Sequence, residues 1–176
     1  MTIRHANGFT LVELLVVVAV IGIVASIAVP GLVRARMSGN EASAIGSLRA
    51  INSAESTFSS SCGEGNYAAT LVGLGTPTSG GGQAFISPDI ATTASGATVI
   101  KSGYAISLGA GGTAVVAGVL SCNGGQPVNA GYGTNADPIS TSSGERHFAS
   151  DSRGAIFVSS SAAIAQPIPA AATPLQ

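Results

Sequence analysis

The chain has 176 residues, of which 45% are hydrophobic and only 9% are charged, and its formal net charge is −1. Its seven basic residues are spread along the whole length and form no cluster, which argues against a dedicated nucleic-acid surface. The chain has no Trp and only eight Phe and Tyr residues in all, so a large aromatic core is excluded.

A short polar leader, residues 1–8, precedes a long apolar run. The 20 residues from Leu14 to Val33 include no ionisable side chain, and a helix of this length covers about 30 Å, the thickness of a bilayer's hydrocarbon core. A secretory signal has a shorter core, of about 7–15 residues, with its cleavage site beyond it. Here the natural cut lies before the core, between Gly8 and Phe9. Cleavage there would leave the predicted membrane or filament-core helix, residues 9–33, on the mature protein.

Glu13 is a single carboxylate inside this apolar segment. A charged side chain at the centre of a spanning helix costs about 2.5–3.5 kcal/mol, so it needs a partner or a function. Once Phe9 is the N-terminus, its ammonium lies four residues from Glu13, or about 6 Å along a helix. The ammonium of a staggered neighbouring copy would then meet this carboxylate at low dielectric, where the attraction is strong. The alternative is a carboxylate that extends to the lipid headgroups.

The run Gly8-Phe9-Thr10-Leu11-Val12-Glu13-Leu14-Leu15 resembles the leader junction of type IV pilins and type II secretion pseudopilins. The resemblance covers about the first 36 residues. It implies that a prepilin peptidase cuts after Gly8 and methylates Phe9, and that Glu13 takes the place of the family's glutamate in assembly. It also implies an α+β, type IV pilin-like fold, in which a long N-terminal helix packs on a small antiparallel β-sheet.

Gly22 and Pro30 fall at the usual places of such residues in the membrane helix of this family. Pro30 lacks the N–H that would bond Ser26, and its ring clashes with that carbonyl, so a bend or break is expected there. Simple tolerance of Gly and Pro in membrane helices is the alternative interpretation.

Residues 34–61 are predicted to continue the same helix as an amphipathic segment, which gives one helix of about 50 residues. Its apolar face is formed by residues at three- and four-residue spacings, namely Ala44, Ile45, Leu48, Ile51, Ala54 and Phe58. Glu41, Asn52 and Glu55 are expected away from that face or against neighbouring copies.

The next segment, residues 62–160, is predicted to form an extracytoplasmic loop and antiparallel β domain. Cys62 and Cys122 are an even pair in a chain with an export segment, which favours one disulfide in an oxidising compartment, the alternative being two free buried thiols. The positive-inside rule does not settle the orientation. The cysteine pair favours a cytoplasmic leader and an external C-terminal part.

Glycine and proline predict a loop from residue 63 to 103, and the glycine-rich run Gly63–Ala68 is interpreted as a turn and not a phosphate loop. Strands are predicted at residues 104–108 and 113–120, joined by a glycine-rich turn. Residues 144–157 indicate a terminal hairpin with an Asp/Gly turn. The tail, residues 161–176, is predicted to be mobile.

No catalytic residue, metal site or cofactor is predicted. His147 would be the mature chain's single histidine, and no His/Cys cluster has zinc spacing. Asp137, Glu145 and Asp151 lack the dense oxygen-ligand spacing of a calcium loop.

The expected function is therefore that of a structural pilin subunit and not of an enzyme. Its expected partners are itself, the prepilin peptidase and methyltransferase, and a pilus or secretion assembly platform. The precursor would lie in the inner membrane and the product in a surface filament, with motility, adhesion or DNA uptake as downstream uses. A type II secretion pseudopilin is the first alternative, and a signal-anchored envelope protein that never polymerises is the second.

Overall fold

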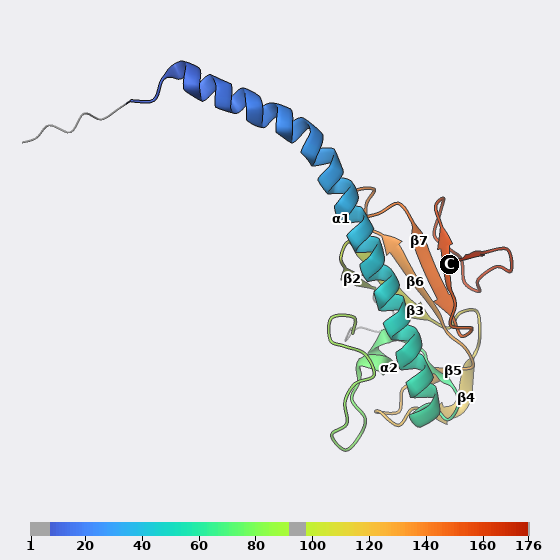
Figure 1. Ribbon diagram of the computed structural model, residues 1–176. Helices are drawn as coiled ribbons and strands as arrows, with labels where there is room; N and C mark the ends of the chain where they lie inside the picture. Colours follow the sequence, from blue (N-terminus) through green and yellow to red (C-terminus); the bar gives the residue numbers. More distant parts are fainter. Residues whose placement is uncertain (1–7, 92–97, 176) are drawn as a thin grey trace, which may run out of the picture. The chain divides into compact units, whose positions relative to one another are not determined.

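The computed structural model describes residues 8–91 and 98–175, so leader residues 1–7 lie outside it. The chain divides into two compact units, an N-terminal unit Met1–Arg36 and a C-terminal unit Met37–Gln176. Helix α1 (Leu11–Ser61) has 51 residues and contributes to both units (Figure 1). The prediction of one helix of about 50 residues is confirmed.

The N-terminal unit consists of the first half of α1. The helix continues through Gly22 and Pro30 without interruption, so it is not broken at these positions, while the bend expected at Pro30 stays a prediction. A proline removes one backbone hydrogen bond, whereas the bonds of the neighbouring turns remain and hold the helix together.

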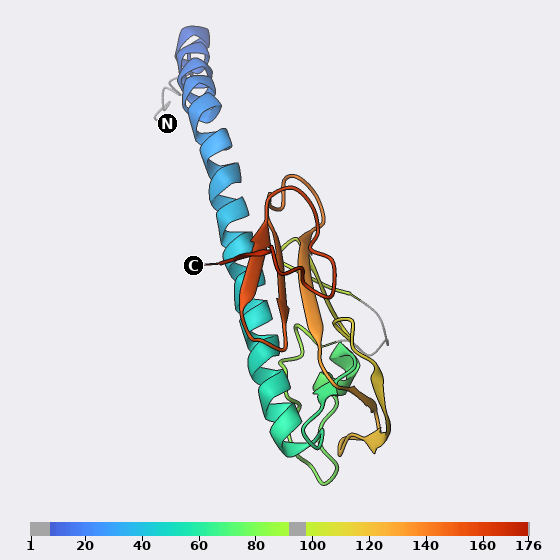
Figure 2. The same ribbon diagram turned by 90° about the vertical axis from the view of Figure 1, so that its right-hand side faces the viewer.

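The C-terminal unit contains a six-stranded antiparallel sheet with the strand order β2-β3-β6-β7-β8-β9 (Figure 2). Its strands are β2 (Val99–Lys101), β3 (Tyr104–Gly109), β6 (Gly133–Pro138), β7 (His147–Asp151), β8 (Ile156–Ser159) and β9 (Thr173–Pro174). The predicted terminal hairpin is confirmed as β7 and β8, with the Gly154 N–H donating to the Asp151 carbonyl across the turn at 2.8 Å.

A second, three-stranded sheet has the order β1-β5-β4. Its strands are β1 (Tyr67–Ala68), β5 (Pro127–Asn129) and β4 (Val115–Leu120), and a short helix α2 (Leu71–Gly75) follows β1. Both strands predicted at residues 104–108 and 113–120 are present as β3 and β4. They lie in different sheets, however, because β3 pairs with β2 and β6 while β4 pairs with β5.

The segment predicted to be a loop, residues 63–103, also contains β1, α2 and β2. These elements are two to five residues long, too short to show a periodic pattern in the sequence. The Thr70 hydroxyl caps α2 by accepting a hydrogen bond from the Gly73 N–H at 3.3 Å.

The main core lies between the second half of α1 and one face of the six-stranded sheet. Leu48, Ile51 and Phe58 of α1 are fully buried there with Tyr104 and Phe148 of the sheet. Successive strand residues face opposite sides of a sheet, and the opposite face is covered too.

A smaller apolar cluster on this opposite face corrects the prediction of a mobile tail. Ala149 and Phe157 of the sheet pack there against Ile164 and Ile168 of the C-terminal segment. The Asn135 amide donates to the Ile164 carbonyl at 2.6 Å and fixes the segment further. Two isoleucines among the prolines and alanines therefore suffice to place residues 161–175 on the sheet.

Candidate functional site

The predicted cleavage position lies immediately before α1. Gly8 and Phe9 are non-helical and exposed, with 74% of the Phe9 surface accessible. Thr10 precedes the first helical residue, and its hydroxyl accepts a hydrogen bond from the Glu13 N–H at 3.2 Å and donates to Glu13 Oε2 at 3.4 Å. This is the geometry of a helix N-cap. The Thr-x-x-Glu spacing signals this cap in the sequence, although no cap was predicted from it.

An apolar surface follows Glu13 without interruption. Large hydrophobic side chains from Leu14 to Val33 are between 41% and 76% exposed. The most apolar 18-residue window of α1 has a mean hydropathy of 2.8, and the helix is long and apolar enough, by length and composition, to cross a membrane. A surface of this size requires lipid or protein against it.

Cys62 and Cys122 form the predicted disulfide in the structure, with their Cα atoms 4.9 Å apart. The Cys122 N–H also donates to the Cys62 carbonyl at 3.1 Å. The bond therefore ties the residue after α1 to the turn that follows β4.

Two glutamates that were expected away from the core face of α1 lie on it. Glu55 is fully buried and Glu41 is 8% exposed. The sequence contains the reason, because both continue the three- and four-residue spacing of Ala44, Leu48 and Ile51 along one helix face. Their polarity, and not their position, led to the wrong prediction.

The pKa values of the two carboxyl groups shift in opposite directions. Glu55 Oε2 accepts a hydrogen bond from the Ala68 N–H at 2.9 Å, and Oε1 has no partner among the described residues. Desolvation, opposed only by this hydrogen bond, raises the pKa of Glu55 to about 8. Burial would raise the pKa of Glu41 as well, but hydrogen bonds from Arg146, at 2.6 and 2.8 Å, and from the Glu145 N–H outweigh it and hold that pKa below its ordinary value.

The acidic residues that were considered as calcium ligands do not lie together in one place. Asp137 Oδ1 lies 2.7 Å from His147 Nδ1, whereas Asp151 pairs with Arg153 and stands opposite Gly133 at the other end of the β6–β7 ladder. Within residues 8–91 and 98–175, no group of three or more His, Cys, Asp or Glu side chains is arranged to hold a metal ion.

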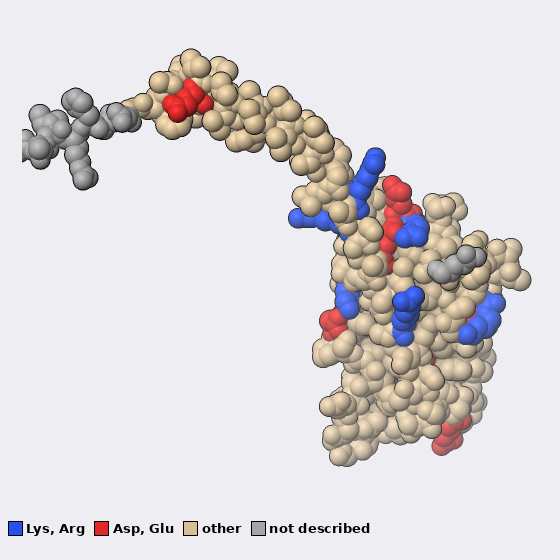
Figure 3. All heavy atoms as spheres, viewed as in Figure 1, with Lys and Arg blue, Asp and Glu red and all other residues tan. Residues whose placement is uncertain are grey.

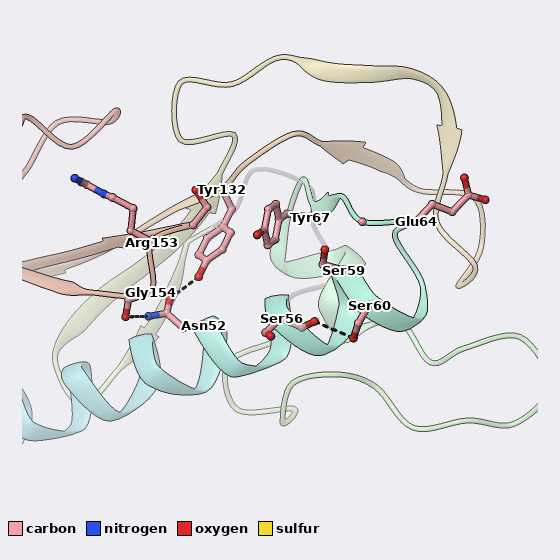
Figure 4. A pocket seen from close by; sticks show the side chains of 11 residues that line it. Asn52, Ser56, Ser59, Ser60, Glu64, Tyr67, Tyr132, Arg153 and Gly154 are labelled. Atoms are coloured by element: carbon pink, nitrogen blue, oxygen red, sulfur yellow. Dashed lines mark hydrogen bonds between the residues drawn. The ribbon is translucent and has the colours of Figure 1, made fainter.

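A groove of about 640 Å³ lies in the C-terminal unit beside the end of α1 (Figure 4). Tyr67 and Tyr132 form one wall, with ring centroids 5.1 Å apart. Asn52 is already engaged there, because it accepts from the Tyr132 hydroxyl and donates to the Gly154 carbonyl. Arg153 and Glu64 lie at opposite ends of the groove in Figure 4. This internal bonding argues for a structural groove and not for a catalytic one.

Comparisons with known proteins match a limited part of the chain. The prokaryotic N-terminal methylation motif matches residues 3–29. The type IV major pilin protein PilA of Myxococcus xanthus is 40% identical over 52 residues, which make up 30% of this chain and 24% of that protein. The type IV wide pilus major component PilA4 of Thermus thermophilus is 50% identical over 38 residues, or 22% of this chain and 29% of that protein. No solved structure matches the chain.

The chain thus matches only about a quarter of the length of these curated relatives. The matched part holds Gly8, Phe9 and Glu13. The α+β fold, a long apolar helix packed on antiparallel sheets, agrees with the expectation drawn from the motif. The chain is therefore similar to type IV pilins in its N-terminal methylation motif and in its long apolar helix packed on antiparallel sheets.

Proposed function

We propose that the chain is a structural subunit of a type IV pilus, cut after Gly8, methylated at Phe9 and polymerised through α1. The observation that carries this proposal is the lone Glu13 carboxylate at the start of an exposed apolar segment of α1 that has no other charge up to Val33. The two relatives are named as components of pili, which supports a pilus over a secretion pseudopilus.

Glu13 has two roles in this proposal. Within one chain it belongs to the Thr10 cap, which orders the first turn of α1. Between chains, its carboxylate pairs with the Phe9 ammonium of a neighbouring copy and sets the register of the stacked helices. A charge left alone at low dielectric is costly, so a subunit in the wrong register is disfavoured.

The apolar half of α1 accounts for the two locations of the subunit. It is soluble only in lipid or against copies of itself, so transfer from the inner membrane into a filament keeps its surface covered. The peptidase and the assembly platform act on the subunit while it is in the membrane. The C-terminal unit then coats the filament, with no catalytic role and no cofactor.

Charge removal at Glu13 tests the proposal. In cells that produce the full chain, we expect Glu13→Gln to lower the amount of sheared surface filament about tenfold or more, because the ammonium of the neighbour loses its partner. Thr10→Ala is the matched control, since it removes the cap and keeps the charge. Filament from this control should stay within about threefold of wild type, because a cap contributes only about 1 kcal/mol.

Intact mass of the sheared material identifies the product. We expect a species that begins at Phe9, carries one additional methyl group and is two hydrogens lighter for the disulfide. Processed protein that stays in the membrane fraction would favour the secretion pseudopilin instead. Unchanged function of Glu13→Gln without any filament would favour an anchored envelope protein.

A further inference from the structure

Most charges of the C-terminal unit are neutralised within the chain. Three ion pairs join Lys101 to Asp89, Arg146 to Glu41 and Arg153 to Asp151, and His147 Nδ1 lies 2.7 Å from Asp137 Oδ1. The face in Figure 3 shows blue side chains next to red ones at several places on this unit, and no large area of one charge. Arg49, Glu64 and Glu145 are exposed residues of the same unit that have no ion-pair partner within the described ranges.

Contact with lipid headgroups does not explain the exposed charge of Arg49. Arg34 and Arg36 directly follow the apolar run, where lipid headgroups supply anions. Arg49 lies sixteen residues beyond Val33, or about 24 Å further along the helix, which exceeds the screening length of about 8–10 Å at physiological salt. It is exposed, while its neighbour Leu48 is fully buried against the sheet. Its position on the unit is therefore fixed, and its charge faces outward.

Glu64 has a backbone conformation that is unfavourable for any residue with a long side chain. Its φ is +52°, a left-handed conformation in which glycine or asparagine is usual. The turn is held by the Gly65 N–H donating to the Ser59 carbonyl at 2.9 Å, by Asn66 donating to the Glu64 carbonyl at 3.3 Å, and by the neighbouring disulfide of Cys62. Figure 4 shows the carboxylate projecting from this turn, away from Arg153. Strained residues of this kind concentrate at functional positions, so a carboxylate presented here needs an explanation.

We propose that Arg49 of one subunit pairs with Glu64 of a neighbouring copy of the chain in the filament. The inference rests on the pilus-subunit function proposed above and names a contact within that assembly. The two groups have opposite charge and lie on one unit without contacting each other. Each subunit therefore offers Arg49 to one neighbour and Glu64 to another, a head-to-tail contact that extends into an open fibre.

The pairing also fixes a distance between copies. Arg49 precedes the end of α1 at Ser61 by twelve residues, or about 18 Å of helix, and Glu64 follows in the next turn. Two parallel copies joined by this ion pair are offset along the helix by about 20 Å.

A charge exchange in the full chain tests the pair. We expect Arg49→Glu and Glu64→Arg each to lower sheared filament about tenfold, because each places like charges together, and the double variant R49E/E64R to recover to within about threefold of wild type. The amount of processed subunit with an intact disulfide in the membrane fraction shows whether each variant folds. Glu64→Gly distinguishes an effect on assembly from an effect on folding, because glycine adopts this left-handed backbone conformation without strain. It should leave subunit abundance unchanged or higher and still lower filament yield.

The remaining outcomes are equally decisive. Glu145→Arg is the matched control, because it reverses another exposed and unpaired carboxylate, and it should not restore filaments to Arg49→Glu. Rescue of Arg49→Glu by Glu145→Arg, rescue of Glu64→Arg by Arg36→Glu, or wild-type filament yield from Glu64→Gly would each overturn the Arg49–Glu64 pair. Absence of filaments from the wild-type chain would instead reject the pilus-subunit function itself.

Discussion

Two glutamates on the core face of α1 show how one side chain acquires different chemistry from its surroundings. Glu41 accepts two hydrogen bonds from the Arg146 cation and one from the Glu145 N–H, so its pKa is lowered and the group stays ionised. Glu55 has one backbone donor and an otherwise closed environment, so burial raises its pKa to about 8. A buried carboxyl without a cation is better kept protonated than charged.

The raised pKa of Glu55 predicts that the protein loses stability as the pH rises. Below about pH 4.5 the carboxyl is protonated in the folded and the unfolded chain, and its favourable contribution is fully present. Between about 4.5 and 8 only the unfolded chain ionises, so the free energy of unfolding falls by about 1.4 kcal/mol per pH unit. We expect Glu55→Gln to remove this slope, as measured by urea unfolding of the full chain in detergent between pH 5 and 8.

The contrast with Glu41 provides the control. Its lowered pKa stabilises the fold at neutral pH and ceases to do so as the pH falls, so Glu41→Gln should keep the slope assigned to Glu55. Tyr132 lies near Glu55, and burial raises the pKa of Tyr132, so this group does not account for a slope below pH 8. An unchanged pH dependence in Glu55→Gln would show that this carboxyl is ionised in the folded chain.

Long periodic elements were predictable from the sequence, and short ones were not. The helix of about 50 residues and the β7–β8 hairpin follow from spacing and from an Asp/Gly turn. Strand β6 was missed although it lies at the centre of the large sheet, because Gly133–Pro138 has almost no strand-forming side chains and is held by neighbours on both sides. The proposed processing and assembly residues Gly8, Phe9 and Glu13 could be predicted because they form a local sequence motif, whereas the conformation of Glu64 depends on its turn.

The C-terminal segment predicts a measurable effect at the level of one element. Ile164 is 9% exposed and packs on Ala149 and Phe157, so Ile164→Ala should lower the free energy of unfolding by about 2 kcal/mol. Ile100→Ala is the matched control, because Ile100 of β2 is 66% exposed and its truncation should change stability by less than about 0.5 kcal/mol. Equal effects of the two variants would indicate that residues 161–175 do not pack on the sheet.

In the whole molecule, the two units differ in the surface that each presents. The N-terminal unit presents a large exposed apolar surface on a helix that is long and apolar enough to cross a membrane. The C-terminal unit buries its own core and neutralises most of its charges internally. The small second sheet is the weakest part of this unit, since β4 and β5 are paired at only two positions, Val115 with Asn129 and Leu120 with Pro127.

The disulfide is therefore expected to hold the second sheet to the end of α1. Cys62 and Cys122 are 60 residues apart, and closing such a loop stabilises a fold by about 4 kcal/mol in the chain-entropy model. We expect the double variant Cys62→Ser and Cys122→Ser to lose about this much in urea unfolding, and reduced wild type to match it. Limited proteolysis locates the effect, because cleavage should begin between residues 63 and 126 while the β6–β8 region stays protected. Since Glu64 follows Cys62 in the same turn, the reduced chain should also form fewer filaments. A cysteine double variant that keeps full stability and full filament assembly would show that the turn is held by its hydrogen bonds alone.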